Sequence, residues 1–464
     1  MRIVLADLKA TDGFVSKDTV AGGYGSRLRP FSKVTSAVCS IKRRLHDLPS
    51  VHLAYIAAQA ARAGHDVCVS TGELLDADVA LVLSSLVDYR REAGWAEAMR
   101  ARGVRVGVVG LATSKMPELF ERSADFVVCG EPEEATARLF RGETMSGRVM
   151  SPEIPDLDSL PFPKWDVFLD HRRRFRLPLA GRPAGGAFPL LASRSCPEFC
   201  TYCPHRILSN YRSRSVANLI DELEQLTDRY PRPYVVFRDP LFTQDRDRVL
   251  ELCDGIERRS LKLTFECETR LDRLDESLLG TMRRAGLRAI SFGVESLSPA
   301  TLKKAGRRPI PEAHMRAMVS SCRHLGIVTA AFFVFGFLED TWDSISATID
   351  YAIDLGPTVA QFKILTPYPG TPLYKRMAPL VTERDWQNFD GFTPTFTHPH
   401  LTNDQLMFLL GAAYTRFYMR PSYVANYLRI TAPHVRDVFS RLDLRVRRMQ
   451  ARRELARMSR PVSC

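Results

Sequence analysis

Short apolar runs alternate with helical stretches in two separate parts of the chain, and this alternation limits the fold more than any other feature of the sequence. In the first part, residues 1–150, a helical pattern covers His52–Ala63. The apolar runs of this part are Arg2–Ala6, Asp66–Ser70, Val79–Ser84 and Val104–Val109. Strands and helices in alternation predict a parallel sheet with helices packed on its faces.

The second part, residues 188–380, continues the alternation through six apolar runs. Its helical patterns include Val216–Tyr230 and Pro311–Leu325. The apolar runs are Phe188–Ala192, Tyr234–Phe237, Lys262–Glu266, Ala289–Gly293, Thr329–Phe335 and Val359–Leu365. Consecutive strand–helix units of this kind predict a full or partial barrel of parallel strands.

Two further segments complete the division of the chain. Residues 151–187 contain many prolines and a Gly-Gly pair, so they are predicted to be a linker. Residues 381–464 are mostly helical by pattern and end in a run rich in arginine. The sequence thus predicts an α/β protein with an N-terminal domain over residues 1–150, a barrel over residues 188–380 and a helical, basic C-terminal region.

The composition is that of a folded protein, with 45% hydrophobic and 25% charged residues. Asp7 interrupts the N-terminus before a signal-peptide core develops, and the longest apolar run, Ile327–Leu338, is well short of the roughly 20 residues that span a membrane. Three of the ten cysteines lie within eight residues, which indicates metal binding in a reducing compartment rather than disulfides. We therefore expect a cytoplasmic protein.

The net charge of +12 favours an anionic partner, whether cofactor phosphates, nucleic acid or a lipid surface. The most basic stretch, residues 424–460, is roughly amphipathic. A solvated helix packed on the barrel is the first interpretation, and a peripheral contact with anionic lipid is the second. RNA binding ranks third, because the stretch has no RNA-module motif and no interleaved aromatic residues.

A loop with three cysteines directly follows the first predicted strand of the second part, and it reads Cys196-Pro-Glu-Phe-Cys200-Thr-Tyr-Cys203. Structural zinc sites and ordinary 4Fe-4S sites use four protein ligands, and no fourth cysteine completes this group. With His205, the three cysteines could form a Cys3His zinc site. Alternatively, three thiolates on a cubane would leave one iron open to a small chelating ligand, at the end of the barrel where such folds place their chemistry.

This loop resembles the cluster-binding motif of the radical S-adenosylmethionine (SAM) superfamily. In that superfamily three cysteines hold a 4Fe-4S cluster, and the amino and carboxylate groups of SAM chelate its fourth iron. The resemblance implies that Cys196, Cys200 and Cys203 are the metal ligands and the catalytic residues, and that Tyr202 lies near the adenine. It also implies SAM as a cosubstrate and an electron donor of the flavodoxin or ferredoxin type.

Other barrel positions follow the resemblance less closely. The stretch Ser291-Phe-Gly-Val-Glu295 is similar to the fourth-strand motif of the family, which implies that Ser291 and Glu295 contact SAM, with Glu295 holding the ribose or the amine. Glu295 could instead cap the helix that follows. Glu268 and Arg270, at the end of the third strand, could bind SAM or form an ion pair. Residues 335–340 depart from the Gly-Leu-Pro-Gly of the family.

Residues 1–150 resemble the cobalamin-binding domain that precedes the barrel in one branch of this superfamily. The similar stretches are Leu53–Ala57, Gly64–Val67, Ser84–Leu86 and Ala124–Glu131. The resemblance implies a doubly wound, flavodoxin-like or Rossmann-like domain, in which small residues let the nucleotide tail of cobalamin approach the strand ends. The cobalamin-binding residues that it implies are Ser84, Ser85, Gly110, Thr113, Gly130 and Glu131.

The chain departs from the cobalamin-domain pattern in two places. It has no Asp-x-His-x-x-Gly, the motif whose histidine coordinates cobalt, and Gly110-Leu111 stands where the family has two glycines. The alternative is a flavodoxin-like domain that only packs on the barrel. A glycine-rich stretch, Ala21–Gly25, does not stand between a strand and a helix, so we expect a flexible segment that covers the barrel mouth rather than a phosphate-binding loop.

Together, these resemblances imply a cobalamin-dependent radical methyltransferase that acts on an unactivated carbon of a small-molecule or lipid substrate. One SAM would supply a methyl group to cobalamin, and a second would yield the 5′-deoxyadenosyl radical that takes hydrogen from the substrate. The first alternative is a radical SAM enzyme that forms a ring or rearranges carbon without methyl transfer. The others are a non-catalytic cobalamin-binding or zinc-binding regulator and a tRNA-modifying radical enzyme.

Overall fold

The computed structural model describes residues 1–421 and 423, with gaps at 18, 46–47, 169–185 and 208. Residues Met1–Phe417 form one compact unit, and the description below concerns this unit. The predicted basic helix over residues 424–460 lies outside the described residues. Within the described ranges, no helix is long and apolar enough to cross a membrane.

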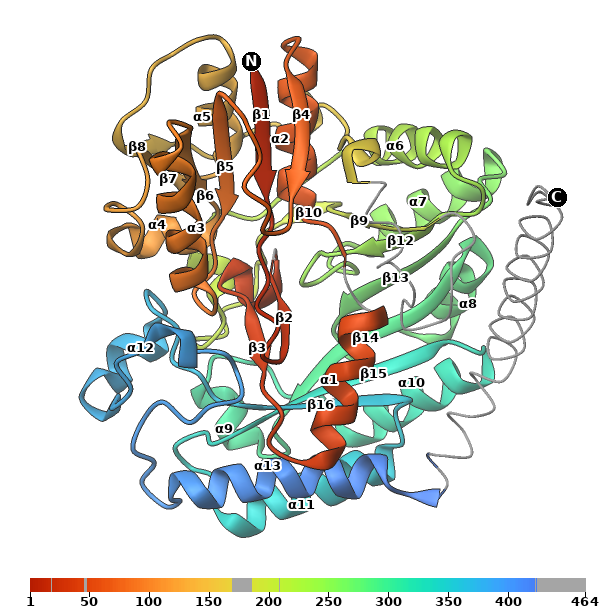
Figure 1. Cartoon of the computed structure of the whole chain (residues 1–464). Coiled ribbons are helices and arrows are strands. Elements are labelled where there is room, and N and C mark those ends of the chain that lie inside the picture. Colours follow the sequence, from red (N-terminus) through yellow and green to blue (C-terminus); the bar gives the residue numbers. More distant parts are fainter. Residues whose placement is uncertain (18, 46–47, 169–185, 208, 422, 424–464) are drawn as a thin grey trace, which may run out of the picture. The chain divides into compact units, whose positions relative to one another are not determined.

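The first sheet has six parallel strands in the order β4-β1-β5-β6-β7-β8. The strands are β1 (Arg2–Ala6), β4 (Asp66–Ser70), β5 (Val79–Leu83), β6 (Arg105–Val109), β7 (Phe126–Gly130) and β8 (Gly147–Ser151). The helices of this part are α2 (Val51–Arg62), α3 (Tyr89–Ala101), α4 (Leu111–Lys115) and α5 (Pro132–Phe140) (Figure 1). This is the doubly wound, flavodoxin-like order, in which ligands bind beyond the carboxyl ends of the strands.

The second sheet also has six parallel strands, and its order β16-β15-β14-β13-β12-β9 follows the sequence. The strands are β9 (Ala187–Leu190), β12 (Tyr234–Phe237), β13 (Thr264–Thr269), β14 (Leu287–Glu295), β15 (Val328–Phe335) and β16 (Val359–Ile364). Between them lie α6 (Val216–Arg229), α7 (Arg246–Arg258), α8 (Glu276–Ala285), α9 (Pro299–Lys304), α10 (Glu312–His324) and α11 (Trp342–Leu355). Sequential parallel strands joined through helices are the arrangement of a partial (β/α)6 barrel.

Helices follow the second sheet, namely α12 (Pro372–Met377) and α13 (Asn403–Tyr418) (Figure 1). The predicted fold class is thereby confirmed: two parallel α/β sheets and a helical region after them. The domain boundaries assigned from the sequence stay a prediction, although the first sheet uses residues 2–151 and the second uses residues 187–364.

An insertion between β1 and α2 reaches from the first sheet to the barrel. It contains the antiparallel hairpin of β2 (Phe14–Ser16) and β3 (Ser26–Leu28), followed by α1 (Lys33–Leu45). At the hairpin tip, Tyr24 is fully buried, donates a 2.7 Å hydrogen bond to the carbonyl of Pro369 and stacks on Tyr368 at 5.6 Å. The glycine-rich stretch is therefore packed into the core, not the loose cover that its composition predicted.

Four buried charged residues attach this hairpin to the start of α3. Lys17 lies 2.6 Å from Glu92 and 3.8 Å from Asp88, and Arg27 lies 2.5 Å from Asp88. All four side chains are at most 4% exposed. Because the charges are paired inside the fold, the hairpin is held in one position relative to the first sheet.

Glu92 should make the stability of the protein depend on pH. Burial raises the pKa of this carboxyl group to about 7, against the opposing effect of Lys17. Because the folded state keeps the proton to a higher pH than the unfolded chain, the free energy of unfolding should fall as the pH rises from about 4.5 to about 7. Urea unfolding should show a smaller fall in Glu92→Gln than in the wild type, because Asp340, whose pKa burial also raises to about 7, contributes the same trend to both proteins. Parallel pH profiles of the two proteins would contradict the assignment.

Candidate active site

The three-cysteine loop leaves the barrel immediately after its first strand and is held at several points. A short ladder of β10 (Ser193–Arg194) and β11 (Arg212–Ser213) closes its base. Within the loop, the amide of Thr201 donates a 2.8 Å hydrogen bond to the carbonyl of Ala305. A Cβ on Gly306, whose φ is +71°, would lie 2.3 Å from the carbonyl oxygen of Phe199, so this turn can approach the loop only as glycine.

Cys196, Cys200 and Cys203 are half-buried and lie close enough to influence one another electrostatically. Burial raises the pKa of Cys196 to about 11 and that of Cys203 further, and the charge of Cys200 adds to both shifts. Nη1 of Arg307 lies 3.8 Å from Sγ of Cys200. A bound metal would displace the protons of the three thiol groups, because the thiolate is the form of cysteine that binds metal.

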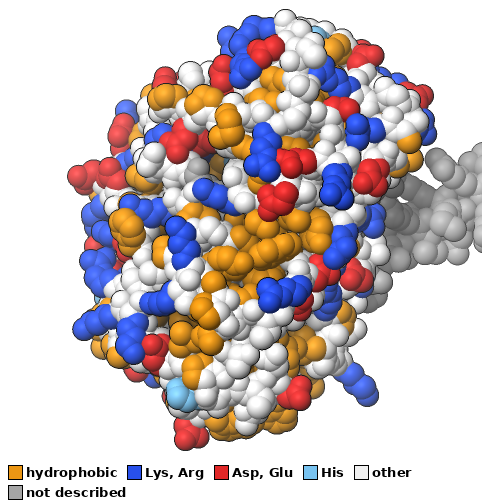
Figure 2. Space-filling model, turned by 90° about the vertical axis from the view of Figure 1, so that its left-hand side faces the viewer, with side chains coloured by type: hydrophobic (Ala, Val, Ile, Leu, Met, Phe, Trp, Pro, Cys, Tyr) orange, Lys and Arg blue, Asp and Glu red, His pale blue; other side chains and the backbone are white. Residues whose placement is uncertain are grey.

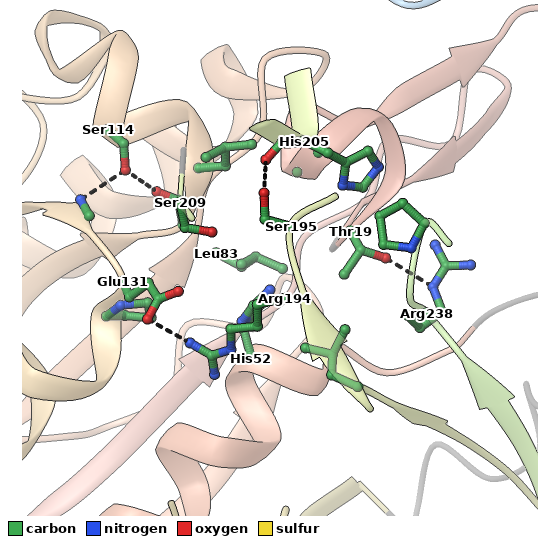
Figure 3. A pocket seen from close by; sticks show the side chains of 18 of the residues that line it. Thr19, His52, Leu83, Ser114, Glu131, Arg194, Ser195, His205, Ser209 and Arg238 are labelled. Carbon is green, nitrogen blue, oxygen red and sulfur yellow. Dashed lines mark hydrogen bonds and ion pairs between the residues drawn. The ribbon is translucent and has the colours of Figure 1, made fainter. Parts of the chain in front are cut away.

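The sequence left open whether the three cysteines hold a cluster or, with His205, a zinc ion. Among the described residues, no group of three Cys, His, Asp or Glu side chains, the three cysteines included, is arranged to hold a metal ion, so the comparison rests on the composition of the donor set. His205 lines a separate pocket, and burial, with the charge of Arg238, lowers its pKa to about 4 (Figure 3). Three thiols on one loop, without a fourth protein ligand, match a cubane with one open iron.

Glu295, a predicted SAM ligand, is held in an unusual backbone conformation beside the loop. Its φ is +67°, and the pairing of β14 with β15 shifts register between Gly293 and Glu295, as at a β-bulge, which re-aims a side chain. Oε1 of Glu295 lies 3.8 Å from Nη2 of Arg307, which also donates a 2.6 Å bond to the carbonyl of Gly293. Ser298, and not Glu295, caps the following helix.

Of the other predicted SAM residues, Tyr202, Glu268 and Arg270 are close enough to Glu295 for the charges to interact. Burial raises the pKa of Tyr202, and the charge of Glu295 raises it further, so the two side chains are close. Glu268 pairs with Ser291 across the β13–β14 ladder, and Ser291 lies in the middle of β14, four residues before Glu295. Arg270 instead donates 3.0 Å bonds from Nε and Nη2 to Asp272, so no ion pair with Glu268 forms.

A pocket lies between the carboxyl ends of the first sheet and the start of the barrel, and its empty space, together with the open solvent at its mouth, is about 800 Å³ (Figure 3). Gly22 and Gly23 of the insertion line one side of it. Ser84 lines this pocket and is only 2% exposed, and its buried Oγ has no hydrogen-bond partner among the described residues. A Cβ on Gly110, whose φ is +118°, would lie 3.0 Å from that oxygen. The pocket is thus lined by Gly110, which has no side chain, and by Ser84, whose hydroxyl group has no hydrogen-bond partner among the described residues.

The structure divides the residues predicted to bind cobalamin. Those that line the pocket are Ser84, Gly110, Gly130 and Glu131. Ser85 and Thr113 do not line it: the Ser85 hydroxyl donates a 2.7 Å bond to Glu92, and the Thr113 hydroxyl lies 2.6 and 2.7 Å from the carbonyl oxygens of Gly110 and Val128, which share its one proton. Glu131 has partners of its own, accepting from the Ile154 amide at 2.8 Å and pairing with Arg212 and Arg194.

Sequence reasoning missed several pocket residues, which come from distant parts of the chain. They include Thr19, His52, Ser114 and Arg194. Nδ1 of His52 is buried without a hydrogen-bond partner in the described part of the chain. His52 directly precedes the stretch Leu53–Ala57 that resembles the cobalamin-binding domain, so its position in the sequence was a usable signal.

A three-cysteine loop after the first strand of a parallel barrel defines the enzymes that cleave SAM at an iron–sulfur cluster. Residues 190–352 match the family model of the radical SAM superfamily. The predicted family, its cluster and its cosubstrate are confirmed at this level.

Similar proteins extend the match beyond the barrel. Over 417 residues, the chain is 28% identical to an uncharacterised methyltransferase of Pyrococcus horikoshii. The alignment covers 80% of this chain and 88% of the relative. It is 27% identical over 276 residues to the anaerobic magnesium-protoporphyrin IX monomethyl ester cyclase of Rubrivivax gelatinosus, covering 59% of this chain and 48% of that enzyme. A similar solved structure is that of the radical SAM methyltransferase TsrM from Kitasatospora setae, which has cobalamin and a [4Fe-4S] cluster bound. The two structures align with a TM-score of 0.60 at 16% sequence identity, over 82% of this chain and 78% of TsrM.

Proposed function

We propose that this radical SAM enzyme is a cobalamin-dependent methyltransferase that acts on an unactivated carbon atom. The observation that carries the proposal is the pocket at the carboxyl ends of β5 and β6, with the unpaired Ser84 hydroxyl and the Gly110 cradle. A flavodoxin-like sheet offers a nucleotide-like ligand its binding place at this edge. The pocket also borders the start of the three-cysteine loop at Ser195.

Residues of the pocket and of the barrel would then have separate tasks. Ser84, Gly110 and Gly130 would receive the nucleotide tail of cobalamin, and His52 and Arg194 would face the rest of the cofactor. When bound, the cluster supplies the electron that cleaves SAM, and cobalamin supplies a carrier for the methyl group. The packed hairpin tip at Gly22 and Tyr24 would keep water away from the site.

On the barrel side, Glu295 and Ser291 would hold SAM beside the cysteines, and Arg307 would fix the orientation of Glu295. Burial raises the pKa of Glu268, and the positive charges of Arg238 and Lys363, which lie near it, lower that pKa. These three charged groups at the strand ends could bind polar groups of SAM or of a small-molecule or lipid substrate. We further propose a reducing, cytoplasmic setting, in agreement with the free thiols of the nine described cysteines.

An anaerobic reconstitution tests the proposed function. The protein is loaded with iron and sulfide, offered cobalamin and supplied with SAM and dithionite, and bound corrinoid and 5′-deoxyadenosine are measured. Both signals together support the methyltransferase. Deoxyadenosine without bound corrinoid would reduce the first domain to a scaffold and overturn the cobalamin part of the proposal.

The cyclase relative of Rubrivivax gelatinosus favours a second candidate on the same scaffold, a radical SAM enzyme that forms a ring. The two candidates differ in the mass of the product. Methyl transfer from labelled SAM adds one labelled methyl group to the substrate, whereas ring formation adds none. Label in the product would therefore exclude the cyclase.

Ser84→Ala should separate cobalamin binding from stability. The Ser84 hydroxyl has no partner in the described part of the chain, so its removal should not destabilise the protein, yet it should weaken cobalamin binding about tenfold, as expected for one lost hydrogen bond. Ser85→Ala is the matched control: it loses the bond to Glu92, but the residue does not line the pocket. Titration of corrinoid absorbance and thermal unfolding check both variants; equal cobalamin affinities would contradict the assigned role of Ser84.

A further inference from the structure

The helix α1 of the insertion crosses the open side of the barrel. The second sheet does not close, so β9 and β16 are its two edges. Before α1, the rings of Phe31 and Tyr414 pack with their centres 6.0 Å apart, and Tyr414 donates a 3.1 Å hydrogen bond to the carbonyl of Phe362 in β16. After α1, Leu48 packs on the apolar cluster of β9 and β12. The helix thus runs from one edge of the sheet to the other, and Figure 1 shows it in front of β14, β15 and β16.

Lys363 of β16 lies on the inner face of this sheet. Buried and half-buried residues alternate along β16, and Lys363 belongs to the half-buried set. Its neighbour Phe362 packs against α13, so Lys363 points to the opposite face, where its Nζ lies 5.8 Å from the ring centre of Phe392. Burial lowers the pKa of Lys363, and the negative charges of Glu268 and Glu295, which lie near it, raise that pKa. Lys363 therefore lies beside the residues proposed to bind SAM.

Lys42 brings a second ammonium group to Lys363 from α1. Cys39 and Thr35, one and two turns before Lys42, are fully buried, so Lys42 lies on the inner face of the helix. Its Nζ lies 5.3 Å from the ring centre of Phe14 in β2. Burial, and then the charge of Lys363, lower the pKa of Lys42 to about 8. The two ammonium groups are thus close enough to repel each other.

Neither of these lysines has a counterion among the described residues. Their Nζ atoms have no carboxylate within the 4 Å of an ion pair and no hydrogen-bond acceptor in that part of the chain, and their close contacts are with aromatic rings. Asp390, another acid near Lys363, already accepts hydrogen bonds from two backbone amides and pairs with Arg29 at 3.2 Å. On the outer surface, by contrast, Lys and Arg side chains lie among Asp and Glu side chains, as Figure 2 shows for the side of the molecule that carries α12. An anion between the two lysines would replace their repulsion with attraction.

We propose that the substrate carries an anionic group, a carboxylate or a phosphate, and that this group binds between Lys42 of α1 and Lys363 of β16. The inference rests on the proposed function, because it places the substrate over the strand ends that would hold SAM. Glu268 does not neutralise the two lysines, since Arg238 also lies near it. The aromatic rings beside both lysines exclude water, which strengthens the attraction between an ammonium group and an anion. The insertion helix thereby becomes part of the active site.

Three probes with the same alkyl chain and different head groups test the proposal, namely octanoate, octyl phosphate and octanol. The test variant, Lys42→Gln/Lys363→Gln, removes both charges of the site. The matched control, Lys33→Gln/Lys375→Gln, removes two charges from exposed lysines of α1 and α12. The proteins are loaded with iron and sulfide and compared by calorimetric titration with each probe, and by 5′-deoxyadenosine formation from SAM with dithionite and no added probe.

We expect the wild type and the control to bind at least one of the two anionic probes at least about tenfold more tightly than octanol, and the test variant to lose this preference. The tighter of the two anions distinguishes a carboxylate from a phosphate. Equal deoxyadenosine formation by all three proteins would show that they fold and that the lysines do not serve SAM.

Two results would overturn the anionic substrate. One is a wild-type protein that prefers neither anion to octanol, and the other is a test variant that no longer forms deoxyadenosine, which would assign the lysines to SAM. A failure of the proposed function is different: the wild type would still prefer an anionic probe, but it would not cleave SAM with dithionite.

Discussion

Cys200→Ala is expected to abolish SAM cleavage and to leave the fold intact. The side chain is only half-buried, and its one contact of note is with Arg307 at 3.8 Å, so its loss leaves no large cavity. Two thiols cannot replace three as ligands of a cubane, so we expect the reconstituted variant to lose its iron and sulfide and all deoxyadenosine formation. Iron content, cluster absorbance and deoxyadenosine are the measurements.

A matched control uses a cysteine of the same barrel that lies far from the loop in sequence. Cys253 of α7 is 1% exposed among apolar residues, so Cys253→Ala should lose some stability by creating a small cavity but keep cluster and activity. Normal SAM cleavage by Cys200→Ala would overturn the cluster assignment. Equal loss of activity in both variants would indicate a general effect of cysteine removal rather than a ligand role.

The features that the sequence predicted well are those encoded over short stretches. The alternation of strands and helices predicts both parallel sheets, because each strand buried on two faces needs a continuous apolar run such as Val79–Leu83. The three-cysteine loop is equally local, since its ligands lie within eight residues. Both patterns involve residues that are close together in the sequence, so they can be recognised without knowledge of the tertiary structure.

The features that the sequence left open depend on contacts between distant segments. Tyr24 is buried against Pro369, which lies 345 residues further along the chain and accepts its hydrogen bond. No residue near the Gly-rich stretch indicates this contact. Glu131, which was predicted to bind cobalamin, lines the pocket, and its carboxylate also pairs with Arg212, 81 residues further along the chain. Ser85 looks like its neighbour Ser84 in the sequence, yet its side chain turns to Glu92, and only tertiary structure separates the two.

Arg194, in the short β10–β11 ladder at the base of the three-cysteine loop, forms an ion pair with α5 of the first domain. Its guanidinium donates bonds of 3.1 and 2.6 Å to the carboxylate of Glu133 and lies 3.1 Å from Glu131. Glu133 is completely buried and Arg194 is 6% exposed. Because Arg194 belongs to β10 and Glu133 to α5 of the first sheet, this ion pair connects the barrel side of the pocket with the cobalamin-type domain.

Arg194→Met should destabilise the protein by about 3–5 kcal/mol, because it leaves a buried carboxylate without its partner. Arg194→Met/Glu133→Gln should recover much of that loss, since the double variant buries no unpaired charge. As a control, Arg138→Met on α5 removes an exposed ion pair with Glu143 and should leave the urea midpoint nearly unchanged. If the single and double variants unfold at the same urea concentration, Arg194 acts through packing, for example on Tyr55 at 5.6 Å, and the charge argument fails.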